Sequence, residues 1–262
     1  MHDFFLVACR VEVGGVVADI ALYTDETRPG NQNRCDKARE TQAIYFTFIQ
    51  FPDWYRNRAH GWLIYGYLEV SIQDQVVGGL SAVVRQVLLH FFSPTSFNIG
   101  VDIKLPVGSS QESLVHLRAR LACLIQDGKA HQLVHSYKGA SGWKCCPHCK
   151  HSLNTNPARI ATSRYLHHYA TATPDDFDEH NNDSFWECVD MVETSSRRGA
   201  TVLHDVEKAT GLRYNEQGLL WDKYLRQYYN AFQGTYHDAM HMLAAIGGRA
   251  ASDHGFLVCS SR

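Results

Sequence analysis

The alternation of apolar and polar positions over the first 140 residues predicts several strands and a single helix. Five runs rich in β-branched and aromatic residues favour extended structure, at 16–26, 43–51, 60–70, 97–105 and 114–127. Over 80–92, apolar side chains recur at helical spacing: Val83, Val84, Val87, Leu88 and Phe91. The order β-β-β-α-β-β predicts an α/β fold with a sheet covered by helices. We interpret the alternating Tyr and Phe residues of 43–67 as strand core, and not as a base-stacking platform.

The second half of the chain changes to helical periodicity. The first predicted helix there has one apolar face, formed by Phe185, Cys188, Val189 and Val192. Its expected N-cap is Asn182 or Asp183. A second helix carries its own apolar face, formed by Val202, Leu203 and Val206. Gly211 is expected to end that helix, and the runs 218–232 and 236–248 are predicted to be helical as well.

Composition and charge narrow the function classes. The chain has 262 residues, 45% of them hydrophobic, and 25 Lys and Arg against 27 Asp and Glu, for a formal net charge of -2. A free-standing nucleic-acid-binding domain is usually basic, so any DNA contact here is expected to be local. The apolar run at 4–9 is too short for a signal peptide, and no run approaches the roughly 18 residues that span a bilayer. We therefore expect no membrane partner.

Two acidic residues end predicted strands about a hundred positions apart. Asp25 lies in "ALYTDET" and Asp127 in "LACLIQDG". One interpretation is turn chemistry, because Asp before "RPGN" and the Asp-Gly pair are both common in turns. The other interpretation requires the two strands to be neighbours in one sheet. The carboxylates would then form a hard-oxygen site for Mg²⁺, and two such ions suit phosphodiester chemistry.

The eight cysteines are scattered except for one cluster in "WKCCPHCKH", where Cys146 and Cys149 form a CxxC pair. A thioredoxin-like redox site requires a strand before the pair and a helix after it. The preceding "SYKGASGW" is not strand-like, and Pro157 interrupts any following helix. A zinc site requires two further ligands, and the candidates are His148, His151, and the pair Asp238 and His241. Unligated cysteines near a turn are the third interpretation.

Taken in order, these segments resemble a DDE transposase of the CACTA/Plavaka kind. The resemblance rests on "LYTDETRPGN", "HGWLIYGYL", "RLACLIQDGKAHQLVHSYKGASGWKCCPHCKH" and "GLLWDKYLRQYYNAFQGTYHDAMHML", which extend over residues 16–248. It implies a ribonuclease-H-like mixed sheet with flanking helices. In such a fold the first acid ends the first strand and the second acid ends the fourth core strand. Asp25 and Asp127 would therefore be catalytic residues that bind Mg²⁺ or Mn²⁺.

The resemblance also implies a mainly α-helical insertion that begins near a CxxC and ends near a DxxH motif. These motifs correspond to Cys146, Cys149, Asp238 and His241, which would hold Zn²⁺ and staple the two ends of the insertion together. We expect His241 to be a ligand and Asp238 either to be one or to orient it. Cys145 is an alternative to Cys146. The expected divisions are a catalytic core over 14–140, the insertion over 141–248 and a degenerate or truncated tail over 249–262.

The activity implied is metal-dependent DNA strand cleavage and strand transfer. Transposon ends and target DNA would be the partners, a homo-oligomer is compatible with this, and the implied location is nuclear. The family's third acid, usually Glu, lies beyond the DxxH, but the only acid after His241 is Asp253. We therefore expect a fragment or a decayed copy. The alternative function is that of a non-catalytic, zinc-containing DNA- or protein-binding remnant of a transposase.

Overall fold

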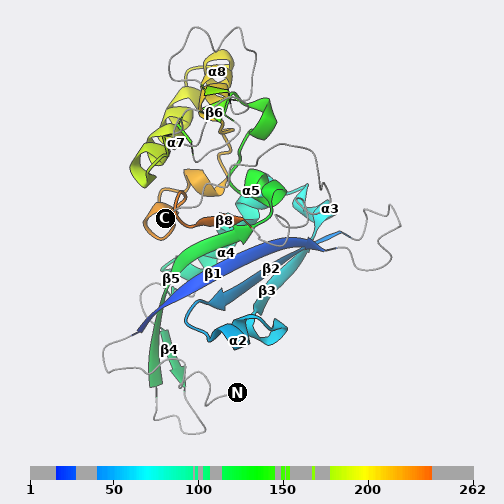
Figure 1. The fold of residues 1–262 in the computed structure, drawn as a ribbon, viewed down its shortest axis with the longest axis vertical. Helices are drawn as coiled ribbons and strands as arrows, with labels where there is room; N and C mark the ends of the chain where they lie inside the picture. Colours follow the sequence, from blue (N-terminus) through cyan, green and yellow to red (C-terminus); the bar gives the residue numbers. More distant parts are fainter. Residues whose placement is uncertain are drawn as a thin grey trace. The chain divides into compact units, whose positions relative to one another are not determined.

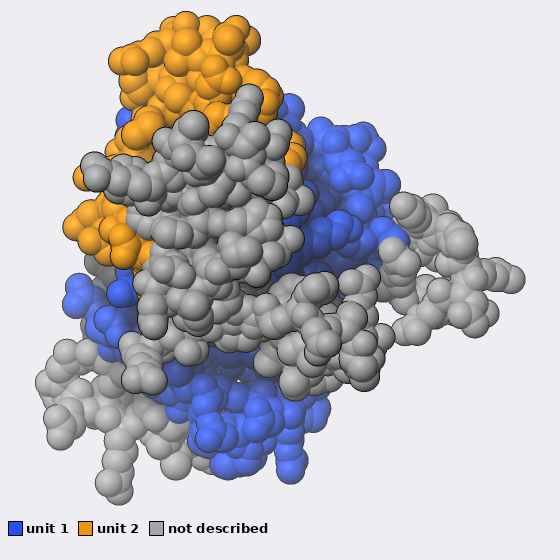
Figure 2. Space-filling view, turned by 45° about the horizontal axis from the view of Figure 1, so that its top comes forward, with its two compact units in different colours: residues 1–135, 215–236 blue, residues 136–214, 237–262 orange. Residues whose placement is uncertain are grey.

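A computed structural model covers residues 1–262, and its well-defined parts fall into two compact units. It describes residues 16–27, 40–96, 98–99, 103–106, 114–144, 149–150, 152–153, 167–168 and 178–237. The first unit comprises residues 1–135 and 215–236, and the second comprises residues 136–214 and 237–262 (Figure 2). The segment 215–236 thus belongs with the first unit, whereas the division expected from the sequence grouped it with the helical insertion.

The first unit is built on a mixed β-sheet (Figure 1). Its strands are β1 (Val16–Thr27), β2 (Thr41–Phe48), β3 (Leu63–Glu69), β4 (Ile103–Pro106), β5 (Leu114–Gln126) and β8 (Thr235–His237). Among the described residues, five strands lie in the order β3-β2-β1-β5-β4, and β8 pairs with β5 outside this path. β1 and β5 are parallel, whereas β1–β2, β2–β3 and β4–β5 are antiparallel. A mixed sheet flanked by helices confirms the predicted α/β class.

One face of this sheet packs against α4, as the helical spacing over 80–92 predicts. The helices of the unit are α2 (Asp53–Arg56), α3 (Val70–Gln73), α4 (Gly79–Phe92) and α5 (Gly128–Val134). On β1 the even-numbered side chains from Ala18 to Thr24 are buried, and Val84, Leu88 and Phe91 of α4 are buried too. The rings of Phe46 in β2 and Phe91 are 5.2 Å apart, which places the main core between the sheet and α4. None of the described helices is long and apolar enough to cross a membrane.

The segment 215–236 follows α4 closely along its length. The Leu219 N–H donates to Ser81 Oγ over 2.9 Å, near the start of the helix. Arg85 and Asp222 form an ion pair of 2.6 Å one turn later. At the far end, the Tyr224 hydroxyl donates to the Phe92 carbonyl over 2.8 Å. These three contacts attach the returning chain to the core helix of the first unit.

The prediction of a helix over 218–232 is wrong. The structure has only two 3₁₀ turns in this run, Leu219–Trp221 and Leu225–Gln227. The Asp222 carboxylate accepts the N–H groups of Tyr224 and Leu225, and such local side-chain bonds compete with helical ones. The predicted helix over 236–248 begins on β8 and otherwise lies outside the described residues.

The second unit contains the two predicted amphipathic helices, α7 (Asn182–Ser196) and α8 (Ala200–Thr210), and a short parallel pair, β6 (Ser152–Leu153) with β7 (His167–His168). The expected cap of α7 is off by one residue, because Asn181 is the N-cap. Its side chain accepts the Ser184 N–H over 2.8 Å, and the Ser184 hydroxyl accepts the Asn181 N–H in return. This capping box satisfies donors that the first turn of a helix leaves unpaired.

The predicted end of α8 is confirmed, but its predicted apolar face is not. Gly211 has φ +76° and ends the helix, and a Cβ there would come within 2.9 Å of the Lys144 carbonyl oxygen. Val202 is 41% exposed, whereas the carboxylate-bearing Glu207 is buried. A polar residue therefore occupies the inner side of this helix.

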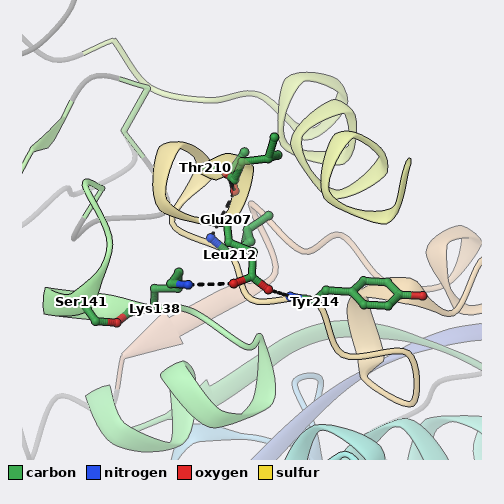
Figure 3. Close-up of polar contacts among 7 residues, drawn as sticks. Lys138, Ser141, Glu207, Thr210, Leu212 and Tyr214 are labelled. Atoms are coloured by element: carbon green, nitrogen blue, oxygen red, sulfur yellow. Dashed lines mark hydrogen bonds and ion pairs between the residues drawn. The ribbon is translucent and has the colours of Figure 1, made fainter. Parts of the chain in front are cut away.

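Glu207 is buried because it forms an ion pair and a backbone hydrogen bond (Figure 3). Lys138 Nζ lies 2.7 Å from Glu207 Oε2, with the two side chains only 8% and 12% exposed. Glu207 Oε1 accepts the Tyr214 N–H over 2.8 Å. Two backbone bonds run beside it, from Lys138 N–H to Gly211 O and from Arg213 N–H to Ser136 O, each 2.8 Å. The end of α8 is thereby tied to the residues that open the second unit.

We predict that Glu207→Gln lowers the free energy of unfolding of the second unit by about 3 kcal/mol. The amide retains an acceptor for Tyr214, but it leaves the buried Lys138 ammonium without a counter-charge, and breaking a buried pair in this way costs about 3–5 kcal/mol. Urea unfolding followed by circular dichroism measures the loss.

The matched control for that experiment is Glu193→Gln on α7. Its partner Arg197 is 78% exposed, so the loss there should be about 0.3–0.5 kcal/mol. The double variant Lys138→Met with Glu207→Gln should recover most of the stability, because it removes the unpaired charge and keeps an acceptor for the Tyr214 N–H. Equal losses for Glu207→Gln and Glu193→Gln would contradict the assignment of a desolvated ion pair.

Candidate functional site

The two predicted acids lie at the same edge of the sheet, because β1 and β5 are parallel neighbours. The last paired positions of the two strands are Thr24 and Gln126. Both side chains are buried, and Gln126 Nε2 donates to Thr24 Oγ1 over 3.0 Å. Asp25 and Asp127 are the next residues on their strands. The condition that the sequence analysis set for a shared site, neighbouring strands, is therefore met at the level of the backbone.

A register shift in the β1–β5 pair determines which residues reach this edge together. Ile20 of β1 pairs with Leu121 of β5, but the next residue of β1, Ala21, pairs with Cys123. Ala122 is thus the extra residue of a bulge, which moves β5 forward by one position relative to β1. Without this extra residue, Asp127 would be displaced by one position relative to Asp25.

Asp25 points away from α4. Buried residues alternate along β1, with Leu22 and Thr24 toward the core, so the intervening residues face the other side of the sheet. Asp25 is half-buried there, opposite Ala43 of β2. The pKa of Tyr45 is raised mainly by burial, then by Tyr67, and further by the negative charge of Asp25. Asp25 therefore lies close enough to Tyr45 for its negative charge to raise the pKa of the Tyr45 hydroxyl.

Asp127 joins the end of β5 to the start of α5. Its Oδ1 accepts the Ala130 N–H over 2.6 Å, which makes it the N-cap of that helix. A carboxylate at this position is stabilised by the unpaired N–H groups and by the partial positive charge of the helix N-terminus. The turn interpretation of Asp127 is thus confirmed in one respect: its side chain bonds to the backbone where the chain turns from β5 into α5. A helix cap also fixes the orientation of the carboxylate at the edge of the sheet.

Lys129 is a charged residue of this region that the sequence analysis missed. Its Nζ lies 2.9 Å from Glu26 Oε2. The pKa of Lys129 is raised first by this hydrogen bond and also by the charges of Glu26, Glu40 and Asp127, against a lowering effect of burial. The only signal in the sequence was its position two residues after Asp127. The carboxylates near the end of β5 therefore already have one cation among them.

Two buried histidines of α5 hold the helix to the returning chain. His135 is fully buried, its Nδ1–H donates to the His131 carbonyl over 3.1 Å, and its Nε2 accepts from the Tyr229 hydroxyl. His131 Nε2–H donates to the Tyr236 carbonyl over 3.0 Å. Because a carbonyl oxygen only accepts, Nδ1 of His135 carries a proton. The network connects the helix that Asp127 caps with β8.

Most of the predicted zinc ligands, namely Cys146, Asp238 and His241, lie outside the described residues, as do Cys145, His148 and His151. Cys149 is described: it is 5% exposed, and its backbone forms an isolated bridge with Glu179. Within the parts of the chain that the structure describes, no three His, Cys, Asp or Glu side chains are grouped so that they could hold a metal ion. The zinc site stays a prediction.

Comparison with known proteins gives no family for this chain. It matches no protein-family model, and no curated protein matches it. What the protein does is therefore inferred from the arrangement of its own residues.

We predict that Tyr229→Phe removes part of the loss of stability at alkaline pH. Burial raises the pKa of Tyr229 above its ordinary value near 10, while the Thr235 hydroxyl lowers it slightly. Above pH 10 the unfolded chain releases a proton that the folded chain keeps, so stability falls as the pH rises. The variant lacks this proton. It should also lose about 1 kcal/mol at pH 7, with the hydrogen bond to His135.

The measurement is the free energy of urea unfolding between pH 8 and 11, compared for the two proteins. The slope against pH should be shallower for Tyr229→Phe above pH 10. Identical slopes would show that the buried phenol does not contribute.

Proposed function

We propose that the protein is a transposase of the DDE type, whose first unit cleaves and transfers DNA strands in a metal-dependent reaction. The observation that supports this most is the parallel pairing of β1 with β5. It brings Asp25 and Asp127 one residue beyond the same buried pair. Carboxylates at the ends of adjacent strands are the oxygen ligands that Mg²⁺ and Mn²⁺ prefer.

The strand order supports a ribonuclease-H-like core for this unit. Three antiparallel strands, β3-β2-β1, are followed along the chain by α4, by the short β4 and then by β5, which is parallel to β1 on its free side. The resemblance to DDE transposases implies this arrangement, with one acid at the end of the first strand and another at the end of the parallel strand.

Each residue near the edge has a defined part in this proposal. A bound divalent ion would stabilise charge on the phosphodiester and activate the attacking oxygen. Asp25 offers its carboxylate from the face opposite α4, and Asp127 offers one that the α5 N-terminus orients. Lys129 balances the charge of Glu26 and lies near Glu40 and Asp127, so it limits the repulsion among the acids.

We further propose that Cys146, Cys149 and His241, with Asp238 as ligand or orienting group, bind Zn²⁺ in the second unit. The burial of Cys149 supports this, because structural zinc sites are closed and their thiolates are shielded from solvent.

The alternative is a non-catalytic, zinc-containing protein that binds DNA or another protein. One observation favours it: the Lys129 ammonium already supplies positive charge close to Asp127, at the edge where a catalytic cation would be needed. The two proposals differ in whether DNA is cleaved.

We predict Mg²⁺- or Mn²⁺-dependent nicking of supercoiled plasmid DNA by the full chain, and its loss in Asp127→Asn. The amide retains an oxygen that accepts the Ala130 N–H, so the cap and the fold should persist while the charge disappears. Loss of a charged metal ligand should lower the nicking rate at least 100-fold, about 2.7 kcal/mol.

Asp53→Asn is the matched control for that assay, because it removes an exposed acid of α2 and should leave nicking unchanged. Equal nicking by the wild type and Asp127→Asn would indicate a contaminating nuclease. A folded sample without nicking would favour the non-catalytic alternative.

We also predict about one zinc ion per purified chain, measured by elemental mass spectrometry. Cys149→Ser should remove it, whereas Cys188→Ser, which alters a half-buried thiol of α7, should retain it. Cys145→Ser and Cys146→Ser decide between the two neighbouring thiols. A chain that is fully folded without zinc would disprove the staple.

A further inference from the structure

Three tyrosines form a continuous row on the sheet face opposite α4. Tyr23 of β1 and Tyr45 of β2 pair across the strands, and their rings are stacked with centroids 6.3 Å apart. Tyr67 of β3 meets the Tyr45 ring edge-on at 6.5 Å. Trp62 contacts Tyr23 at 6.0 Å. Some of the aromatic side chains that the sequence analysis assigned to the strand core therefore lie on the opposite face of the sheet.

The part of this face on β3 is exposed to solvent, whereas Ala21, Ala43 and Thr47 of the same face are buried. Tyr67 is 60% exposed and Ile64 beside it 54%, while Tyr23 and Tyr45 are half-buried. The neighbouring Tyr65 lies on the other side of β3, where its hydroxyl is 2.7 Å from His90 Nδ1 on α4. A bulge between Ile44 and Tyr45 shifts the register of β2 and β3, and it places Tyr67 opposite Ala43.

The aromatic row adjoins Asp25. Tyr67, Ala43 and Asp25 occupy one cross-strand line, and Ile64, Tyr45 and Tyr23 occupy the next. Ala43 is fully buried between its taller neighbours. Tyr45 is on the strand next to Asp25, and Tyr67 is two strands from it, roughly 10 Å away across the sheet.

The same face carries two basic side chains beside the acidic Asp19 and Asp25. Arg118 and Arg120 of β5 pair with Val17 and Asp19 of β1, which places them on the side of Tyr23 and Asp25. Both arginines are exposed, and Arg120 also bonds to Asp19. With a rise of about 3.3 Å per residue, Arg118 is roughly 20 Å from the level of Tyr23 along the strand. Single-stranded nucleic acid is held by stacking of its bases on aromatic side chains, together with basic side chains that contact its backbone.

We propose that the face bearing Tyr23, Tyr45 and Tyr67 binds unpaired nucleotides of a DNA strand by stacking and directs that strand toward Asp25. This inference rests on the proposed function and specifies the form of its substrate: a frayed or single-stranded end, and not a closed duplex. Bases stack on any aromatic ring irrespective of sequence, so the surface contributes affinity and position but little sequence preference.

The test measures binding by the full chain without added Mg²⁺ or Mn²⁺, so that the proposed cleavage does not occur and any bound zinc is retained. Fluorescein-labelled single-stranded and duplex DNA, each of about 15 nucleotides, are titrated and followed by fluorescence anisotropy. We expect the single strand to bind at least 10-fold more tightly than the duplex. Tyr67→Ala should weaken single-strand binding about 10-fold, the effect of removing one stacked ring.

Two variants distinguish stacking from a change in the fold. Tyr67→Phe retains the ring and should bind within about 2-fold of the wild type. Tyr236→Ala removes an exposed tyrosine from β8, away from the row, and should have no effect. Photocrosslinking of a strand that contains 5-bromodeoxyuridine should label Tyr45 or Tyr67 in the peptide map.

The other outcomes either overturn the inference or separate it from the proposed catalysis. Equal binding of single strand and duplex, insensitive to Tyr67→Ala, would mean that only charge attracts the DNA. A dimer that becomes a monomer in Tyr67→Ala, with DNA binding unchanged, would assign the face to a second copy of the chain. Binding of single strands that depends on Tyr67, without any nicking, would retain the inference and reject the proposed catalysis. Nicking, with binding unaffected by Tyr67→Ala, would retain the proposed catalysis and reject the inference.

Discussion

The parallel pairing of β1 with β5 is the constraint on which the rest of the first unit depends. It is anchored by Thr24 and Gln126, two buried polar residues whose side chains bond to each other at the end of the strands. A slip of one residue would bury the outward side chains and expose the core ones, because side chains alternate across a sheet. The same register that buries Leu22 and Leu124 therefore brings Asp25 and Asp127 to one edge.

Near this edge of the sheet, single residues both stabilise the fold and take part in the proposed chemistry. Asp127 caps α5 while it offers a carboxylate, and Lys129 in the first turn of α5 pairs with Glu26. Deeper in the unit, the hydrogen bond between His135 and Tyr229 holds α5 to the returning chain. A helix held by polar contacts at both ends, of which those of His135 are buried, gives a carboxylate at its N-terminus little freedom to move. That restriction suits a group that must be placed before a substrate arrives.

Sequence patterns predicted what depends on local periodicity. β1, β2, β5 and α4 follow their apolar residues, and Gly211 ends α8 as its conformational freedom suggests. The sequence predictions failed where contacts between distant residues, or competing local hydrogen bonds, determine the structure. Asp222 caps its own turn and prevents a helix, and Glu207 is buried because Lys138, 69 positions away, neutralises it. The outward direction of Tyr45 and Tyr67 depends on which face α4 covers, and residue composition does not contain that information.

The separation of β1 and β5 along the chain has a consequence for how the protein is made. Thr24 and Gln126 are 102 positions apart, whereas β1, β2 and β3 are consecutive and antiparallel. On the ribosome the three local strands can pair first, but β1 then presents an open edge until β5 has been synthesised. At about 5–20 residues per second, that interval lasts several seconds. An unpaired apolar edge is a site of aggregation, so the vulnerable period in the life of this protein falls before its proposed active site exists.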